Sequence, residues 1–422
     1  MSYLGLLPHD IWTIAIAVMA AMTCSLLGTF LVARRLSLLG DSISHAILPG
    51  IAIAFLLTSS RSFIPMLIGA FGAGLTTVLA TQFLTHFGRI RDDAAMGIVF
   101  SSLFAIGVII ITLAARNVDL DPGCVLYGLL ELAPFDTISV LGVDIPRAFL
   151  TISIIGTISL IVIVLLFKEL KLSAFDPAFA NSVGINSTII HYIFMTLVAA
   201  ACVAAFEAVG SILVIALLIS PPAAALLCCK RLENTLALST LFGAISAIVG
   251  YLASVQLNTS SAGAIASTSG VLFFLVFLIN YRSGVIFQLF RRIKLRLRIL
   301  TEDLLGELYR KQESGKDLEL KLDGFSEKLA LFYLKTKGLI TTNDKLYQLT
   351  PSGLLKAQEV IRSHRLWESY LSTNLPLAED HLHAPSHRAE HFISSDTLQS
   401  LNNELKTELD PHGRKIPNSE RD

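Results

Sequence analysis

The stretch IWTIAIAVMAAMTCSLLGTFLVA, residues 11–33, contains 23 residues and not one charged side chain. About 20 helical residues are enough to cross the roughly 30 Å hydrocarbon core of a bilayer. Eight more apolar stretches follow it, at residues 43–58, 63–86, 94–115, 147–167, 188–206, 210–229, 234–255 and 263–279. The second and ninth stretches are short, so eight spans is an alternative to nine. The pattern predicts an all-α polytopic membrane domain.

The composition separates this domain from a polar C-terminal part. The chain of 422 residues is 53% apolar and 16% charged, whereas soluble proteins are about 45–50% apolar and about 25% charged. Of the 33 Lys and Arg residues, 11 lie in residues 1–281 and 22 in the remainder. This distribution excludes a purely soluble enzyme, a secreted disulfide scaffold and a disordered protein.

The basic residues also predict the orientation, because Lys and Arg collect in cytoplasmic loops. If the N-terminus is outside, the inside loops carry eight basic residues: Arg34, Arg35, Arg89, Arg91, Lys168, Lys171, Lys230 and Arg231. The outside loops then carry three: Arg61, Arg116 and Arg147. We therefore expect a multi-pass protein of the inner (plasma) membrane with a cytoplasmic tail. The tail begins with a basic segment, residues 291–298, that suits anionic lipid.

Two ionisable residues lie at the cytoplasmic end of the second span. Asp41 and His45 are spaced i,i+4, which places their Cβ atoms about 5–6 Å apart on one helix face. Ionisable groups within a span are costly and are therefore candidates for function. A carboxylate and an imidazole suit Mn, Fe or Zn. The alternative is an internal hydrogen bond that orients the helices.

The inside loop at residues 168–187 predicts a short helix at the membrane surface. Asp176 can cap this helix, Pro177 can occupy its first position and Gly184 can end it. Such a helix is a candidate docking element for another protein; the alternative is a plain connector.

These segments resemble the permease subunits of ABC-type importers for manganese, zinc and iron, the family called ABC-3. The matching segments are residues 34–50, 120–122, 127–128, 168–184 and 209–223. The resemblance implies a dimeric permease, an external metal-binding protein that delivers the ion, and ATPase subunits docked through Asp176, Pro177, Ala180 and Gly184. It also places Asp41 and His45 on the ion path. Since the sequence contains no GxxxxGK[ST] motif, we expect a separate ATPase subunit to hydrolyse ATP, not this chain.

Residues beyond about 300 follow the pattern of a small α+β domain. Thr301, Glu302 and Asp303 are expected to open an amphipathic helix, with Thr301 as its cap. A second helix is expected near residues 325–336, then a strand-turn-strand unit at 338–349 and a helix from 350 to about 371. This order is typical of a winged helix.

Histidine and acidic residues are concentrated in the tail. His364 and Glu368 are spaced i,i+4, as are His387 and His391, and Glu390 and His383 lie nearby. Imidazoles and carboxylates on one face can bind a divalent ion. The alternative is an exposed histidine-rich helix without metal.

The tail is similar to the iron- and manganese-dependent repressors of the DtxR type over residues 300–417. The resemblance assigns His364, Glu368 and His383 to one ligand set, and Asp303, His387, Glu390 and His391 to another. It implies a bound divalent metal (Mn, Fe or Zn). His387 stands where the family has Cys or Glu, whereas Asp303 matches the manganese-sensing branch.

The segment between Tyr309 and Leu339 is shorter than in these repressors. The candidate recognition helix, residues 326–335, is mostly apolar, whereas base recognition requires polar side chains. Metal sensing or dimerisation is therefore favoured over DNA binding. We expect a permease domain at 1–285, a basic linker at 286–300, an incomplete winged-helix region at 301–353, a metal-binding region at 354–417 and an end segment at 418–422.

The sequence thus predicts a metal permease of an ABC importer with a fused metal-responsive domain. One alternative is a proton-coupled secondary carrier, in which Asp41, His45 and Glu207 form the proton relay. A second is a membrane-tethered, metal-dependent transcriptional repressor.

Overall fold

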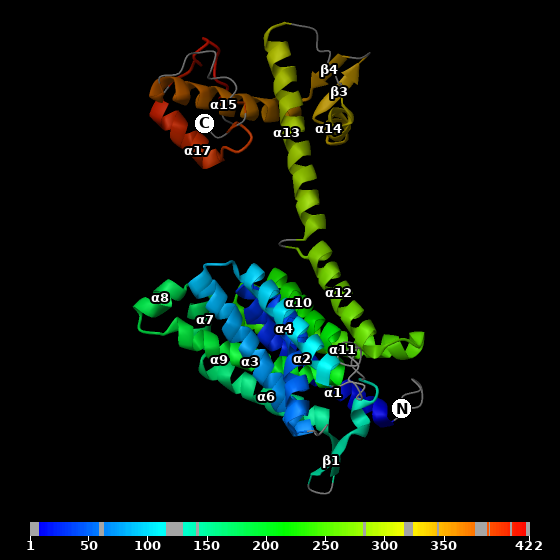
Figure 1. The fold of residues 1–422 in the computed structure, drawn as a ribbon. Coiled ribbons are helices and arrows are strands. Elements are labelled where there is room, and N and C mark those ends of the chain that lie inside the picture. The colour runs from blue at the N-terminus through cyan, green and yellow to red at the C-terminus, as the bar shows by residue number, and fades with distance from the viewer. Residues whose placement is uncertain are drawn as a thin grey trace. The chain divides into compact units, whose positions relative to one another are not determined.

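The computed structural model describes residues 8–58, 63–114, 130–140, 143–281, 284–315, 324–343, 346–375, 386–387, 389–405 and 407–418. The chain divides into two compact units, Met1–Phe287 and Gln288–Asp422. Figure 1 shows the helices of both units.

Nine helices in the described part of the first unit are long and apolar enough to cross a membrane. They are α1 (Pro8–Ala33), α2 (Leu39–Thr58), α3 (Phe63–Gly88), α4 (Asp92–Ala114), α6 (Arg147–Leu165), α9 (Ser187–Val209), α10 (Ser211–Cys228), α11 (Leu232–Leu257) and α12 (Ser261–Ile279). Each predicted apolar stretch corresponds to one of them, which confirms the polytopic helical fold.

Glycine allows several of these helices to approach closely. A Cβ atom on Gly28 of α1 would lie 2.1 Å from the carbonyl oxygen of Leu218 in α10. A Cβ atom on Gly50 of α2 would lie 2.2 Å from the carbonyl oxygen of Gly69 in α3. Small residues at such crossings let helix backbones pack in a bilayer, where lipid gives little hydrophobic drive for association.

The connections between spans carry further structure. Between α4 and α6 lie the short helix η1 (Ala133–Phe135) and the antiparallel strands β1 (Thr137–Val140) and β2 (Val143–Pro146), which the sequence analysis did not predict. Between α6 and α9 lie α7 (Phe167–Phe175) and α8 (Pro177–Ser182). The helix α8 is the short helix expected after Asp176.

The second unit contains most of α13 (Val285–Glu313), then α14 (Phe325–Thr336), β3 (Ile340–Asn343), β4 (Leu346–Leu349), α15 (Pro351–Asn374) and α17 (Ser395–Leu405). Strands β3 and β4 pair antiparallel. The predicted helix, hairpin and long helix are confirmed.

The expectation that a helix begins at Thr301 is wrong. The helix α13 begins at Val285, and the Thr301 hydroxyl donates to the carbonyl of Arg298 within the helix, at 2.7 Å. No Gly or Pro occurs between residues 285 and 301, so nothing ends the helix there. The segment expected as a basic linker is therefore helical.

The core of the second unit joins α13 to the hairpin. Leu304, Leu305 and Leu308 of α13 pack with the buried residues of α14, β3 and α15. The helix α15 starts where Thr350 accepts a hydrogen bond from the Gly353 N–H, at 3.1 Å. A Cβ atom on Gly353 would lie 1.9 Å from the carbonyl oxygen of Leu339, so only glycine fits there.

Candidate metal and docking sites

The structure places Asp41 and His45 on one face of the first turns of α2. Asp41 Oδ1 lies 3.4 Å from His45 Nε2, and both side chains are half-buried. The His45 ring contacts Phe100 and Phe104 of α4, with centroid distances of 5.6 and 5.7 Å. Two aromatic rings thus hold the imidazole beside the carboxylate.

The pair offers two ligand types that suit a metal ion. Within the described residues, no third His, Cys, Asp or Glu joins Asp41 and His45 in a group of ligand atoms. Divalent transition metals take at least four ligands in proteins, so the pair alone would not complete a metal site.

Glu207 lies in a different place. It lines a cavity of about 200 Å³ with Asp136 and Arg147, at the start of α6. At the other end of α6, the following helix α7 contacts Arg34, which comes seven residues before Asp41. Because α6 has 19 residues, its two ends are about 28 Å apart. Among the described contacts, none joins Glu207 to Asp41 or His45, so the structure does not assemble the suggested proton relay.

The predicted docking helix has the expected caps. Asp176 Oδ1 accepts a hydrogen bond from the Phe179 N–H at 2.9 Å, Pro177 is its first residue, and Gly184 has a φ of 89°. Ala180 is fully buried and anchors the helix from its inner side. Large apolar side chains are exposed around it: Phe175, Phe179 and Val183.

A half-buried arginine joins this region to the spans. Arg34, directly after α1, donates from Nη2 to Ser173 Oγ at 2.8 Å and to the Leu170 carbonyl of α7 at 3.4 Å. Its Nη1 lies 3.3 Å from His191 Nδ1 in α9, and His191 Nε2 lies 2.8 Å from Gln82 Oε1 in α3. The network, here called the Arg34 network, ties α7 to α1, α9 and α3.

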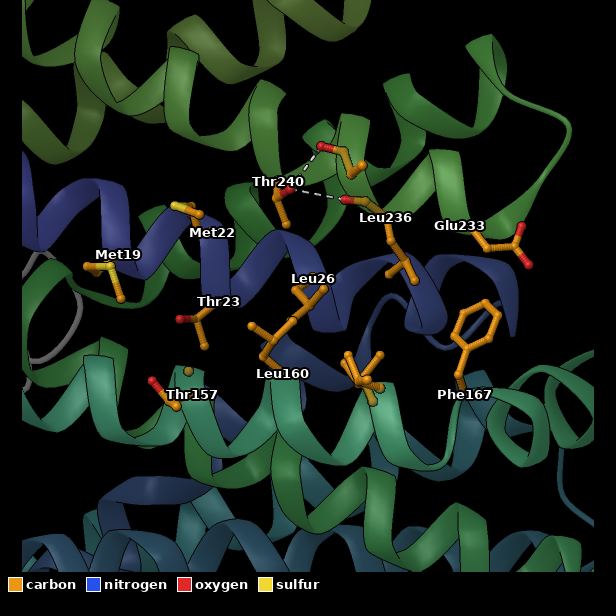
Figure 2. A pocket seen from close by; sticks show the side chains of 14 residues that line it. Met19, Met22, Thr23, Leu26, Thr157, Leu160, Phe167, Glu233, Leu236 and Thr240 are labelled. Atoms are coloured by element: carbon orange, nitrogen blue, oxygen red, sulfur yellow. Dashed lines mark hydrogen bonds between the residues drawn. The ribbon is translucent and has the colours of Figure 1, made fainter.

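A larger cavity of about 580 Å³ lies between α1, α6 and α11 and is lined mainly by apolar side chains (Figure 2). Its threonine Thr240 donates to carbonyls of its own helix, and Glu233 pairs with Lys171 at 2.9 Å. The chemistry of this lining does not suit a metal ion.

In the tail, four ligand atoms of Asp303, His387, Glu390 and His391 lie within 4.8 Å of one another. Glu390 and His391 side chains are only 2% and 3% exposed. Asp303 Oδ1 and His391 Nε2 are 3.1 Å apart and form an ion pair when the imidazole is protonated. Two imidazoles and two carboxylates this close together are a donor set that fits a divalent cation.

Glu302 orients His391 in this cluster. His391 Nδ1 lies 2.8 Å from Glu302 Oε2, which leaves Nε2 facing Asp303 and Glu390. Burial lowers the pKa of His391, but the carboxylates of Asp303 and Glu302 outweigh burial and raise it to about 9. Without metal, the imidazole is therefore protonated at neutral pH.

A second group of ligand types lies beside the first. His364 Nε2 is 3.8 Å from Glu368 Oε2, and His412 Nε2 is 3.4 Å from Glu368 Oε1. Glu390 joins the two groups, because its Oε2 lies 2.6 Å from His364 Nδ1 while its Oε1 lies 3.5 Å from His391 Nε2. A cavity of about 540 Å³ opens onto this second group.

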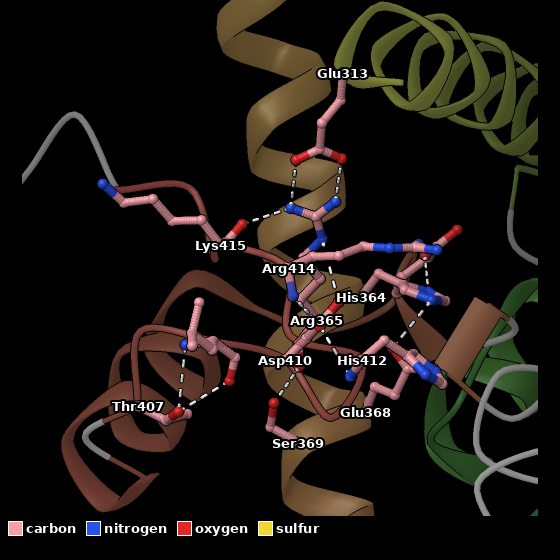
Figure 3. Close-up of polar contacts among 12 residues, drawn as sticks. Glu313, His364, Arg365, Glu368, Ser369, Thr407, Asp410, His412, Arg414 and Lys415 are labelled. Atoms are coloured by element: carbon pink, nitrogen blue, oxygen red, sulfur yellow. Dashed lines mark hydrogen bonds and ion pairs between the residues drawn. The ribbon is translucent and has the colours of Figure 1, made fainter. Parts of the chain in front are cut away.

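Arg365 fixes the chain around the second group (Figure 3). Its guanidinium pairs with both carboxylate oxygens of Glu313 and donates to the Lys415 carbonyl. Asp410 Oδ1 accepts from the backbone N–H groups of His412 and Arg414, at 3.0 and 2.7 Å. These bonds shape the turn that carries His412.

Of the tail residues expected from the sequence, six are brought together, and His383 lies outside the described residues. Sequence reasoning missed two contacts, those of Glu302 and His412. Glu302 lies beside Asp303 in the sequence, but its partner His391 is 89 positions away. Sequence spacing along one helix cannot reveal such a contact.

Comparison with known proteins gives matches to both parts of the chain. The family described as "ABC 3 transport family" matches residues 9–280. The family described as "Iron dependent repressor, metal binding and dimerisation domain" matches residues 350–418.

Curated relatives and a solved structure match the membrane part. The manganese transport system membrane protein MntD of Bacillus subtilis is 42% identical over 288 residues, 68% of this chain and 97% of its own length. The zinc transport system membrane protein TroD of Treponema pallidum is 38% identical over 356 residues, 82% of this chain and 97% of its own length. PsaBC from Streptococcus pneumoniae in complex with Fab matches with a TM-score of 0.54 at 29% identity, over 65% of this chain and 93% of that chain.

The membrane helices thus carry the family match, and the clustered histidines of the tail lie in the second matched region, whereas Asp303 comes before it in the sequence. The chain belongs to the ABC 3 transport family and carries a C-terminal domain of the iron-dependent repressor type.

Proposed function

We propose that this protein is the permease subunit of an ABC importer that moves manganese, zinc or iron into the cytoplasm. The observation that carries the proposal is the Asp41–His45 pair, set within a span of a chain that belongs to the ABC 3 transport family. The named functions of its relatives, which are manganese and zinc transport, support this class of substrate.

A second permease subunit would complete the ion path. The Asp41–His45 pair is half-buried and lacks a third protein ligand among the described residues, which suits a path formed between two chains. A partner chain with a similar pair would supply two further ligands.

Energy would come from a separate ATPase subunit docked on α8. The exposed side chains of Phe175, Phe179 and Val183 offer an apolar surface for that partner. The sequence has no phosphate-binding loop of its own. An external metal-binding protein would deliver the ion on the opposite side.

The Arg34 network would carry movement from the docked ATPase to the spans. Arg34 bonds the helix before α8 and stands at the end of α1, seven residues before Asp41. A half-buried polar network among apolar helices has few alternative partners, so its members move together.

The orientation follows from the same elements. The docking helix and the basic residues Arg34 and Arg35 belong to one side of the bundle, which the positive-inside rule assigns to the cytoplasm. The N-terminus is then outside and the tail inside.

The tail would bind the same class of metal and report its cytoplasmic level. The cluster of Asp303, His387, Glu390 and His391 supports metal binding. The exposed face of α14 carries Phe325, Phe332 and Tyr333, which suits protein or lipid contact better than base recognition. The five segments expected from the sequence, with boundaries at 285, 300, 353 and 417, remain our proposal for the domain division.

Reconstitution tests the proposal against the proton-coupled alternative. The permease, with and without an ATPase subunit of a related importer, is placed in liposomes and metal uptake is measured. We expect uptake that requires ATP and the ATPase and that persists when a protonophore collapses the proton gradient. Uptake without ATPase that a protonophore abolishes would refute the proposal.

A further inference from the structure

The first turns of α13 expose an apolar stripe. Leu289, Phe290 and Ile293 are 57%, 64% and 49% exposed, and Leu297 continues the same line. At 3.6 residues per turn, these four positions fall within an arc of about 100°, the width of the apolar face of an amphipathic helix. A stripe of this size on a helix surface needs an apolar environment to cover it.

Basic residues flank this stripe. They are Arg291, Arg292, Lys294, Arg296 and Arg298, all exposed, and no acidic residue occurs between positions 285 and 301. Arg298 pairs with Glu302 at 2.8 Å, which leaves four cations before the first carboxylate. The charge therefore complements an anionic surface.

The start of α13 lies close in the sequence to a candidate membrane span. The helix α12, a candidate span, ends at Ile279, and α13 begins six residues later at Val285. Six residues extend by at most about 21 Å. The start of α13 is therefore held within reach of lipid headgroups.

A second copy of the helix is the competing occupant, because the heptad frame through Ile286, Phe290, Ile293, Leu297 and Leu300 is apolar at each core position. A second copy would bring the same exposed Arg and Lys residues against these, and like charges repel. The charge of the helix therefore favours an anionic surface over a second copy.

We infer that the first half of α13, residues 286–298, is an interfacial helix that binds a membrane surface containing anionic phospholipid. Its apolar stripe enters the headgroup–acyl boundary, and its Arg and Lys side chains contact lipid phosphates. The same helix carries Glu302 and Asp303 of the tail cluster. The metal site is thus built on a helix whose other end contacts the lipid.

Spin labels on opposite faces of the helix test this inference in the full chain. In a variant without native cysteines, Ile293→Cys reports on the stripe and Leu295→Cys on the opposite face, where Leu295 is similarly exposed (43%). Each labelled protein is placed in liposomes of phosphatidylcholine with 30% phosphatidylglycerol. Collision rates with oxygen, which dissolves in lipid, and with a water-soluble nickel complex are measured.

We expect the label at residue 293 to collide mainly with oxygen and the label at 295 mainly with nickel. Equal nickel access at both positions would overturn the inference. Shielding of the residue 293 label from both reagents would also overturn it and would indicate a protein partner.

A variant with fewer positive charges tests whether the helix binds anionic lipid. In the triple variant Arg291→Gln, Arg292→Gln and Lys294→Gln, the nickel access of the residue 293 label should rise at least threefold. The matched control removes three exposed lysines in and directly after α14, with Lys328→Gln, Lys335→Gln and Lys337→Gln, and should leave that access unchanged. An equal effect of both triple variants, or none from the first, would contradict binding to anionic lipid by α13.

Discussion

If the tail binds metal as proposed, His391 would determine how protons and metal compete there. Because its pKa is raised to about 9 without metal, a proton must leave before Nε2 can bind an ion. The affinity for Mn²⁺ should therefore rise about tenfold per pH unit between pH 7 and 8, with release of about one proton. Calorimetry in buffers of different ionisation enthalpy measures both quantities, and an affinity independent of pH would contradict the assignment.

Glu302→Gln provides the matched test. Loss of this carboxylate lowers the pKa of His391. Fewer protons are then released when Mn²⁺ binds near neutral pH, and the affinity for Mn²⁺ depends less steeply on pH. An unchanged slope would show that Glu302 does not set the pKa of His391.

For single residues, sequence spacing predicted the contacts within one helix but not the contacts between residues of different helices. The i,i+4 spacing of Asp41 and His45 predicted their proximity, and the Asp176 cap is present in the structure. The contacts of Arg34 with α7, α9 and α3 were not predicted, because they depend on how the helices pack.

At the scale of elements, the Arg34 network should couple ATP hydrolysis to transport. Arg34→Gln removes the charge and shortens the side chain, so α7 loses its bonds to α1. We expect the ATPase to remain bound, while metal ions moved per ATP fall at least fivefold.

The neighbouring Arg35→Gln serves as control, since Arg35 is exposed and loses the same charge. An equal number of metal ions moved per ATP in both variants would contradict the role of Arg34. Loss of ATPase binding in Arg34→Gln would instead assign Arg34 to docking.

The elements themselves were predictable where hydrophobic length decides them. The nine candidate spans among the described residues follow from runs of apolar residues. The start of α13 and the β1–β2 hairpin were missed for different reasons. Leucine and arginine favour a helix as strongly in residues 285–300 as beyond them. The strands β1 and β2 are joined by Leu141-Gly142, a weaker turn signal than the Asn343-Asp344 that marked the hairpin of β3 and β4.

For the whole molecule, Glu390 offers a single change that should uncouple the tail from transport. Its two oxygens face the two ligand groups, so Glu390→Gln weakens both. We expect basal uptake to persist and inhibition of uptake by preloaded cytoplasmic metal to disappear. Glu404→Gln, on α17, is the control. Inhibition that persists in Glu390→Gln would show that the tail does not regulate the permease.

The division into membrane and tail parts was visible in the charge distribution, because lipid excludes charge from the spans. The arrangement of ligands in the tail was not, since α13, α15 and the segment at 386–391 meet only through the fold. Family resemblance, not spacing, supplied the assignment of Asp303.

We propose that Asp41 and His45 line the ion path. The most direct test is ATP-driven uptake of radioactive manganese and zinc by the reconstituted importer with Asp41→Ala and His45→Ala combined. Asp93→Ala and His86→Ala, at other helix ends, form the matched control. We expect at least a tenfold loss of uptake in the first variant, with ATPase binding and expression retained, and little loss in the control. Uptake of both metals at the unaltered rate in the first variant would contradict it.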